Sequence, residues 1–162
     1  MKNFFCLAQQ VDVPSILYEL HRGMGHKWRP LREKTQVLPI RENLAGAGFS
    51  WYTSAGLVNK IKPLVFDLAR RVEATRIEDV SCIRFAPGTK GELHLNGGAY
   101  EVFEEYFIIV EADKGAILRC DEEQICPAPG QVWWVASNKE AVAQNYSASD
   151  LTYITVKLWV EQ

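Results

Sequence analysis

Apolar residues in the first half of the chain recur at the period of an amphipathic helix. A stretch from Thr53 or Ser54, either of which can cap a helix, to about Glu73 carries apolar residues at spacings of three and four. These residues are Leu57, Ile61, Leu64, Val65, Leu68 and Val72. Pro63 either kinks this helix or marks the first turn of a shorter one. A further helix is predicted from Pro14 to Arg22, because proline suits a first turn and Gly23 follows its end.

From residue 80 onward the pattern changes to short apolar runs separated by turn residues. The predicted strands are residues 80–85, 105–111, 116–120, 131–136 and 151–160. The turns include Pro87-Gly88 and Pro129-Gly130. Strands at this spacing favour a sandwich or small barrel over alternating βα units. The last run is apolar at most positions, so we expect it to be buried on both faces.

Composition and charge exclude several classes of protein. The chain has 162 residues, of which 48% are hydrophobic, with a net charge of −2. This favours one globular domain, and it gives no reason to expect binding to nucleic acid or membranes. The four cysteines form no C-x-x-C pair, and the apolar opening is too short for an export signal. We therefore expect reduced thiols and a cytoplasmic location.

Several motifs follow one another in a characteristic order. Residues 82–99 read CIRFAPGTKGELHLNGGA, and GAILRCDEEQ, PGQVWW and VAQN follow. This series resembles the aspartyl/asparaginyl β-hydroxylase family of Fe(II)/2-oxoglutarate oxygenases. The resemblance implies a mainly β fold, a double-stranded β-helix of the jelly-roll or cupin type. Residues 80–162 would form its core and residues 1–79 an N-terminal helical and extended layer, within a single domain.

The resemblance also assigns the metal positions. The family's first histidine stands six residues after the glycine of the Pro-Gly turn, which is His94 here. Two residues on, where many oxygenases carry an acid, stands Asn96, so His94 and Asn96 are the candidate metal ligands. The second histidine would stand eleven residues after Gly130, but that position is Ala141, which cannot bind metal.

The positions that would bind 2-oxoglutarate have changed as well. The family's arginine on the closing strand corresponds to Leu151, and its arginine and histidine on the central strand correspond to Glu104 and Tyr106. A guanidinium suits a carboxylate, whereas Glu104 would repel one. Family positions are therefore lost at Ala141, Leu151 and Glu104. Glu104, Tyr106, Trp134 and Leu151 remain candidates for lining a cavity.

Two functions follow from these substitutions. The first is a catalytically degenerate binding module for a small molecule or a protein partner, with no cofactor. The alternative is a hydroxylase that uses Fe(II) and 2-oxoglutarate through rearranged ligands. His94 is then either a hydrogen-bonded histidine at the barrel mouth or a metal ligand, and His21 and His26 could complete a rebuilt metal site. The sequence leaves the oligomeric state open.

Overall fold

The computed structural model describes residues 2–22, 26–43, 48–51, 54–94 and 103–161, and Asn96 lies outside this part of the chain. Its helices are α1 (Val13–Arg22) and α2 (Ala55–Arg71). Its strands are β1 (Phe4–Leu7), β2 (Arg29–Arg32), β3 (Thr35–Asn43), β4 (Phe49–Trp51), β5 (Arg76–Phe85), β6 (Lys90–Glu92), β7 (Phe103–Glu111), β8 (Ala116–Cys120), β9 (Glu123–Ile125), β10 (Val132–Val135), β11 (Ala141–Asn145) and β12 (Leu151–Trp159).

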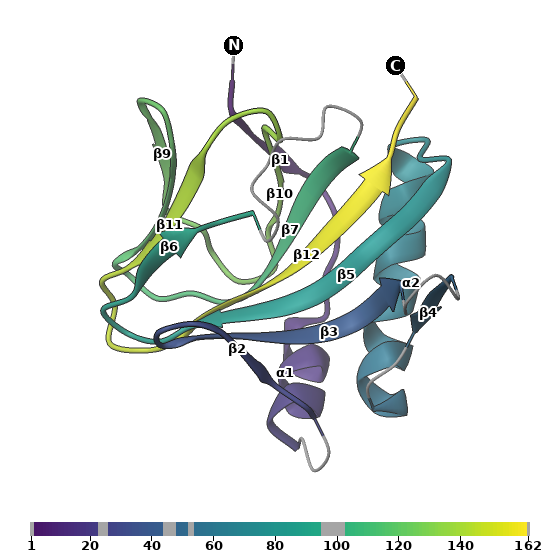
Figure 1. Ribbon diagram of the computed structural model, residues 1–162, viewed down its shortest axis with the longest axis horizontal. Helices are drawn as coiled ribbons and strands as arrows, with labels where there is room; N and C mark the ends of the chain where they lie inside the picture. Colours follow the sequence, from purple (N-terminus) through teal and green to yellow (C-terminus); the bar gives the residue numbers. More distant parts are fainter. Residues whose placement is uncertain (1, 23–25, 44–47, 52–53, 95–102, 162) are drawn as a thin grey trace.

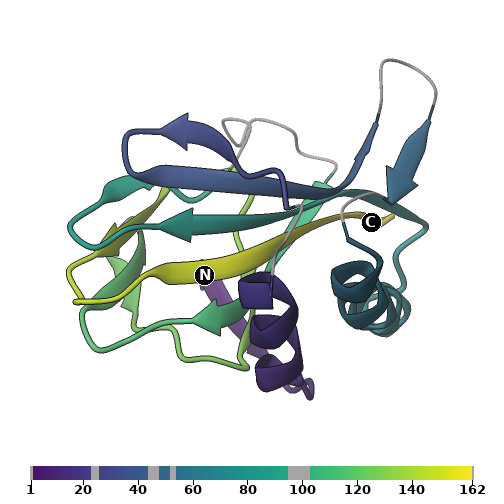
Figure 2. The ribbon, with the colours of Figure 1, turned by 90° about the horizontal axis from the view of Figure 1, so that it is seen from below.

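The strands form two antiparallel sheets (Figure 1). The larger sheet has the order β1-β10-β7-β12-β5-β3-β2, with β4 paired to β3, and the smaller has the order β6-β11-β8-β9. The smaller sheet faces one side of the larger sheet, and α1 and α2 lie side by side against the other (Figure 2). This arrangement confirms the mainly β, double-stranded β-helix fold.

Strand β12 separates two hydrophobic cores. Its side chains alternate between the sheet faces, as a strand requires. Ile154, Val156 and Leu158 belong to the core under the helices, whereas Leu151 and Tyr153 belong to the core between the sheets. Residues 151–158 are all buried, as the apolar run predicted.

Both predicted helices are present, and their first turns are capped. Asp12 accepts hydrogen bonds from the backbone and hydroxyl of Ser15 at the start of α1. Ser54 accepts from the backbone N–H of Leu57 at the start of α2. Pro63 lies inside α2, so the alternative of a shorter helix that begins at this proline is wrong. Neither helix is long and apolar enough to cross a membrane.

The five predicted strands correspond to β5, β7, β8, β10 and β12. The sequence pattern gave no strand before residue 80, yet four strands from that region join the larger sheet. Strand β3 pairs with β5, and β1 pairs with β10 at the opposite edge. The N-terminal segment therefore supplies strands to the larger sheet as well as the two helices.

Candidate functional site

The two faces of β7 contribute side chains to different cores. Phe107 and Ile109 belong to the core between the sheets, whereas Tyr106 and Ile108 belong to the core under the helices. Successive side chains alternate, so Glu105 points toward the space between the sheets and Glu104 toward the helix side. The acid that meets His94 is therefore Glu105, which the sequence patterns did not single out.

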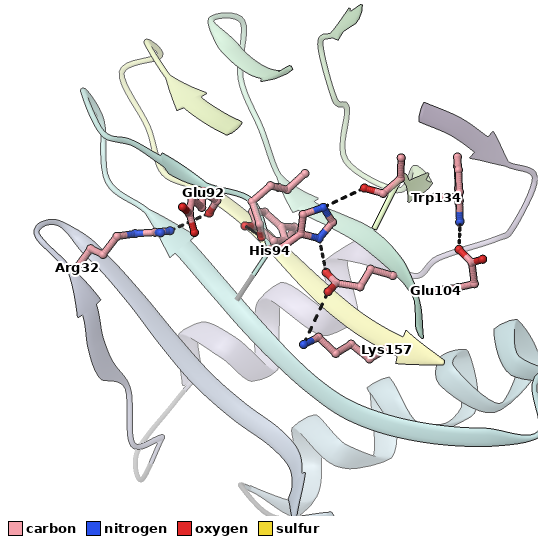
Figure 3. A network of polar contacts seen from close by, with 10 residues as sticks. Arg32, Glu92, His94, Glu104, Trp134 and Lys157 are labelled. Carbon is pink, nitrogen blue, oxygen red and sulfur yellow. Dashed lines mark hydrogen bonds and ion pairs between the residues drawn. The ribbon is translucent and has the colours of Figure 1, made fainter. Parts of the chain in front are cut away.

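His94 follows β6 and is only 4% exposed. Its Nδ1 lies 2.7 Å from Oε2 of Glu105, and its Nε2 lies 3.2 Å from the carbonyl oxygen of Ala136 (Figure 3). The edge of the imidazole also meets the ring of Phe107, with 5.8 Å between ring centroids. Both ring nitrogens are thus hydrogen-bonded to protein oxygens, with no lone pair directed at open space.

The hydrogen-bond pattern restricts where protons lie. A backbone carbonyl oxygen can only accept, so the Nε2 of His94 carries a hydrogen. The contact between Nδ1 and Glu105 then needs one proton, which is held by the imidazole or by the carboxyl. His94 and Glu105 therefore form a buried pair that shares a proton.

Lys157 extends this network from β12. Lys157 stands opposite Glu105 in the pairing of β12 with β7, and its Nζ lies 3.7 Å from Oε1 of the glutamate. Glu105 is 4% exposed and Lys157 8% exposed. Buried charges in proteins are normally paired, because removing an unpaired charge from water is costly. Glu105 is thus bonded from both sides, by His94 and by Lys157.

The positions that the family uses for its second histidine and its arginine are apolar and buried. Ala141 is 1% exposed and Leu151 is fully buried, both in the core between the sheets. Aromatic rings pack beside them: Tyr153 lies 6.0 Å from Phe85 and 5.3 Å from Phe107, measured between ring centroids. Leu151 was a candidate for lining a cavity, but it is instead part of this packed core.

Glu104, Tyr106 and Trp134 lie on the other side of the large sheet. Trp134 donates its indole N–H to Glu104, away from the His94 network (Figure 3). Tyr106 and Trp134 line a hollow of about 360 Å³ on the helix side. These three candidates thus stand together on the helix side, and none of them faces the space between the sheets. Glu104 therefore cannot repel a ligand bound between the sheets by direct contact.

The described residues do not fit ferrous iron and 2-oxoglutarate. Among them, no three His, Cys, Asp or Glu side chains form a group that could hold a metal ion. The nitrogens of His94 are already hydrogen-bonded, and Ala141 and Leu151 offer no donor atom or cation. Asn96, the other candidate ligand, lies outside the described residues.

Within the described part of the chain, His21 and His26 do not join His94 in a metal site. His21 Nε2 lies 3.8 Å from Glu111, six residues along β7 from the glutamate that meets His94. That separation corresponds to about 20 Å along a strand. His26 Nε2 lies 2.7 Å from the carbonyl oxygen of Glu19. Each of these histidines therefore has a partner of its own.

Comparison with known proteins supports the fold. No protein-family model matches the sequence, and no curated protein matches it. Among solved structures, an oxidoreductase of the 2OG-Fe(II) oxygenase family from Burkholderia pseudomallei is similar, with a TM-score of 0.71 and 15% identity over 97% of this chain and 84% of that one. The viral collagen prolyl hydroxylase of Paramecium bursaria Chlorella virus-1 has a TM-score of 0.64 and 11% identity, and the match covers 99% of this chain and 97% of that one. A Pseudomonas putida prolyl-4-hydroxylase has a TM-score of 0.60 and 10% identity, and the match covers 99% of this chain and 94% of that one.

These similarities place the chain among proteins with the fold of the Fe(II)/2-oxoglutarate oxygenases. At such low identity the likeness concerns the fold and not the activity. The finer assignment to the aspartyl/asparaginyl β-hydroxylase family rests on the sequence motifs alone.

Glu105 and Lys157 are the polar residues that the sequence patterns missed. The sequence did contain a signal for Lys157. Lys157 stands within a run of otherwise apolar and hydroxyl-bearing residues, and a lysine in a fully buried strand requires a partner. The acid on the neighbouring strand could not be chosen in advance, because Glu104 and Glu105 are adjacent in the sequence.

Proposed function

We propose that this chain is a binding protein built on the oxygenase fold, and that it does not use His94 to hold iron. The observation that carries this proposal is the engagement of both imidazole nitrogens, by Glu105 and by the carbonyl of Ala136. A metal ligand must present an unprotonated nitrogen to the ion. His94 would have to give up the hydrogen bond of the nitrogen that binds the metal before it could serve.

The apolar positions support the same proposal. The positions assigned by resemblance to the second imidazole and the guanidinium are occupied by Ala141 and Leu151, which are buried in a packed core. The collinear motifs around His94 support a divergent member of the aspartyl/asparaginyl β-hydroxylase family, with a small molecule or a protein as its ligand.

A second candidate is a hydroxylase with rearranged ligands. The similarity in fold favours it, because the match to the Burkholderia oxidoreductase covers 97% of this chain. This candidate requires the imidazole of His94 to leave Glu105 or Ala136, and it requires further ligands to come from other residues.

Titration with ferrous iron and 2-oxoglutarate under anaerobic conditions separates the two functions. We expect neither ligand, alone or with the other, to change the unfolding temperature or to release heat on mixing. Micromolar binding in which each ligand requires the other, and which His94→Gln abolishes, would overturn the binding-protein proposal. The exposed His21→Gln variant is the matched control, since it changes the same residue type away from the site.

A further inference from the structure

A hollow of about 650 Å³ lies between the start of α1 and the middle of α2, two helices that pack side by side (Figure 2). We call it the interhelix hollow. Its apolar wall is formed by Val11 before α1, Ile16 on α1, and Pro63 and Leu64 on α2. Ile16 belongs to the core under the helices, and Val11 and Leu64 pack against that core. Ligand sites in proteins have about 300–1,000 Å³ and mostly apolar walls, so the interhelix hollow suits a small molecule.

The polar residues of the lining are Gln10, Asp12 and Lys60, two of which carry opposite charges. Asp12 directly precedes α1, and Lys60 stands on α2 one turn before Leu64. Among the described residues, neither Asp12 nor Lys60 forms an ion pair. The hollow is thus lined by a carboxylate and an ammonium that are not paired with each other.

The carboxyl group of Asp12 is ionised at neutral pH. It accepts hydrogen bonds from the hydroxyl and the backbone N–H of Ser15. These hydrogen bonds lower the pKa of Asp12, and the positive charge of Lys60 lowers it further. The charge of Lys60 therefore acts on Asp12 although the two groups do not touch, and a ligand that carries both charges could join them.

The first turn of α1 offers no free donor to an anion. The N–H groups of Val13, Ser15 and Ile16 donate to oxygens of residues 11–12. Pro14 has no N–H to offer. Helix N-termini bind anions through such N–H groups, so Lys60 is the group of this lining that can attract a carboxylate.

The two charges of the lining select against a ligand that has only one charge. An anion is attracted by Lys60 and repelled by Asp12, and the reverse holds for a cation. A zwitterion can place its ammonium beside Asp12 and its carboxylate beside Lys60. An α-amino acid joins both charges to a side chain, and an apolar side chain matches the wall that contains Ile16 and Leu64.

We propose that the interhelix hollow binds a free amino acid with a large apolar side chain. Asp12 holds the α-ammonium, Lys60 holds the α-carboxylate, and the apolar wall contacts the side chain. This inference goes beyond the proposed function, because the hollow lies on the helix side of the large sheet, whereas His94 meets Glu105 on the other side. Binding in the hollow does not depend on whether His94 holds iron.

Phenylalanine and two analogues that each lack one charge provide the experiment. Phenethylamine lacks the carboxylate, and hydrocinnamate lacks the ammonium. Binding is measured from amide chemical shifts during titration, with saturation-transfer NMR on the aromatic protons of each probe. We expect phenylalanine to bind in the millimolar range, about threefold more tightly than either analogue, since exposed ion pairs contribute little each. The shifts should be centred on the start of α1 and the middle of α2.

Two variants test the charges separately. Lys60→Met removes the ammonium and keeps an apolar stem, and Asp12→Asn keeps an oxygen that can accept from Ser15. Lys60→Met should weaken phenylalanine binding about threefold and strengthen phenethylamine binding. Asp12→Asn should weaken phenylalanine binding by a similar factor and strengthen hydrocinnamate binding. Lys90→Met, at an exposed position on the smaller sheet, is the matched control and should change none of these affinities.

Equal affinity of the unchanged protein for phenylalanine and both analogues would overturn the inference, and this comparison requires no variant to fold. Shifts centred outside α1 and α2, or no binding of phenylalanine at millimolar concentrations, would overturn it as well. The same holds if the folded Lys60→Met and Asp12→Asn variants bind every probe as the unchanged protein does. Titration with iron and 2-oxoglutarate tests the proposed function separately, because the result there does not change if phenylalanine fails to bind.

Discussion

The imidazole of His94 and the carboxylate of Glu105 lie 2.7 Å apart between the two sheets. The two residues are separated by eleven positions in the sequence. His94 follows β6 of the smaller sheet and Glu105 lies in β7 of the larger sheet, so their contact links the two walls of the barrel. His94 and Glu105 thus form a polar connection between the sheets.

Removal of the imidazole should destabilise the fold. His94→Ala leaves Glu105 buried with one partner fewer, and loss of one member of a buried pair costs about 3–5 kcal/mol. We expect a decrease of that order in the free energy of unfolding, measured in urea at pH 7. His21→Ala, at an exposed position, should change it by less than about 0.5 kcal/mol. A cost below about 1 kcal/mol for His94→Ala would show that the link contributes little.

The contact itself can be isolated by a double-mutant cycle. His94→Ala and Glu105→Ala should each be costly, but the double variant should cost less than the sum of the two. The residues touch, so a coupling of about 0.5–3 kcal/mol is expected from unfolding in urea. Additive costs would mean that the two side chains stabilise the fold independently.

An arginine placed at position 151 should not create a site for 2-oxoglutarate. Leu151 is fully buried in the core between the sheets, so Leu151→Arg places an unpaired charge there. We expect this variant to lose more than about 3 kcal/mol of stability, whereas Leu151→Met should lose less than about 1.5 kcal/mol. The measurement is unfolding in urea. A stable Leu151→Arg protein that gains binding of 2-oxoglutarate would contradict the packed core described above.

High pH should destabilise the protein through its buried tyrosines. Burial raises the pKa of Tyr153 well above 10, and the pKa of Tyr106 is about 12. The unfolded chain loses these protons near pH 10 while the folded chain keeps them, so the stabilisation is complete below pH 10 and is lost as the pH rises. Each such tyrosine should lower the free energy of unfolding by about 1.4 kcal/mol per pH unit in that range.

Tyr153→Phe tests this effect in two pH ranges. At pH 7 it removes the hydrogen bond to the carbonyl of Leu93, at a cost of about 1–3 kcal/mol. Above pH 10 the free energy of unfolding should fall less steeply with pH, by the contribution of one tyrosine, about 1.4 kcal/mol per pH unit. Tyr146→Phe, at an exposed position, is the control and should produce neither change. A decline as steep as in the unchanged protein would contradict the assignment to Tyr153.

The four thiols should separate into two classes. Cys6 and Cys126 are exposed, whereas Cys82 and Cys120 are buried, and burial raises the pKa of both buried thiols. In the native protein we expect a disulfide reagent to react rapidly with two thiols, and with all four in denaturant. Rapid reaction of Cys82 without denaturant would contradict the packing around β5.

The sequence by itself determined the main elements. Helical spacing defined α1 and α2, and short apolar runs between Pro-Gly turns defined the long strands, because these patterns are local. The family resemblance, through its spacing from the proline-glycine turn, singled out His94. The strands β1 and β3 went unrecognised, since Pro39 interrupts one and the other is only four residues long.

Only the tertiary structure decided which face of β7 meets His94. The run FEEYFIIVE is apolar on both sides of the strand, so its pattern does not reveal which residues point between the sheets. A shift of one residue moves every side chain to the opposite face. Pairing with β12 fixes that choice, directing Glu105 to His94 and Lys157 and leaving Glu104 and Tyr106 on the helix side of the large sheet.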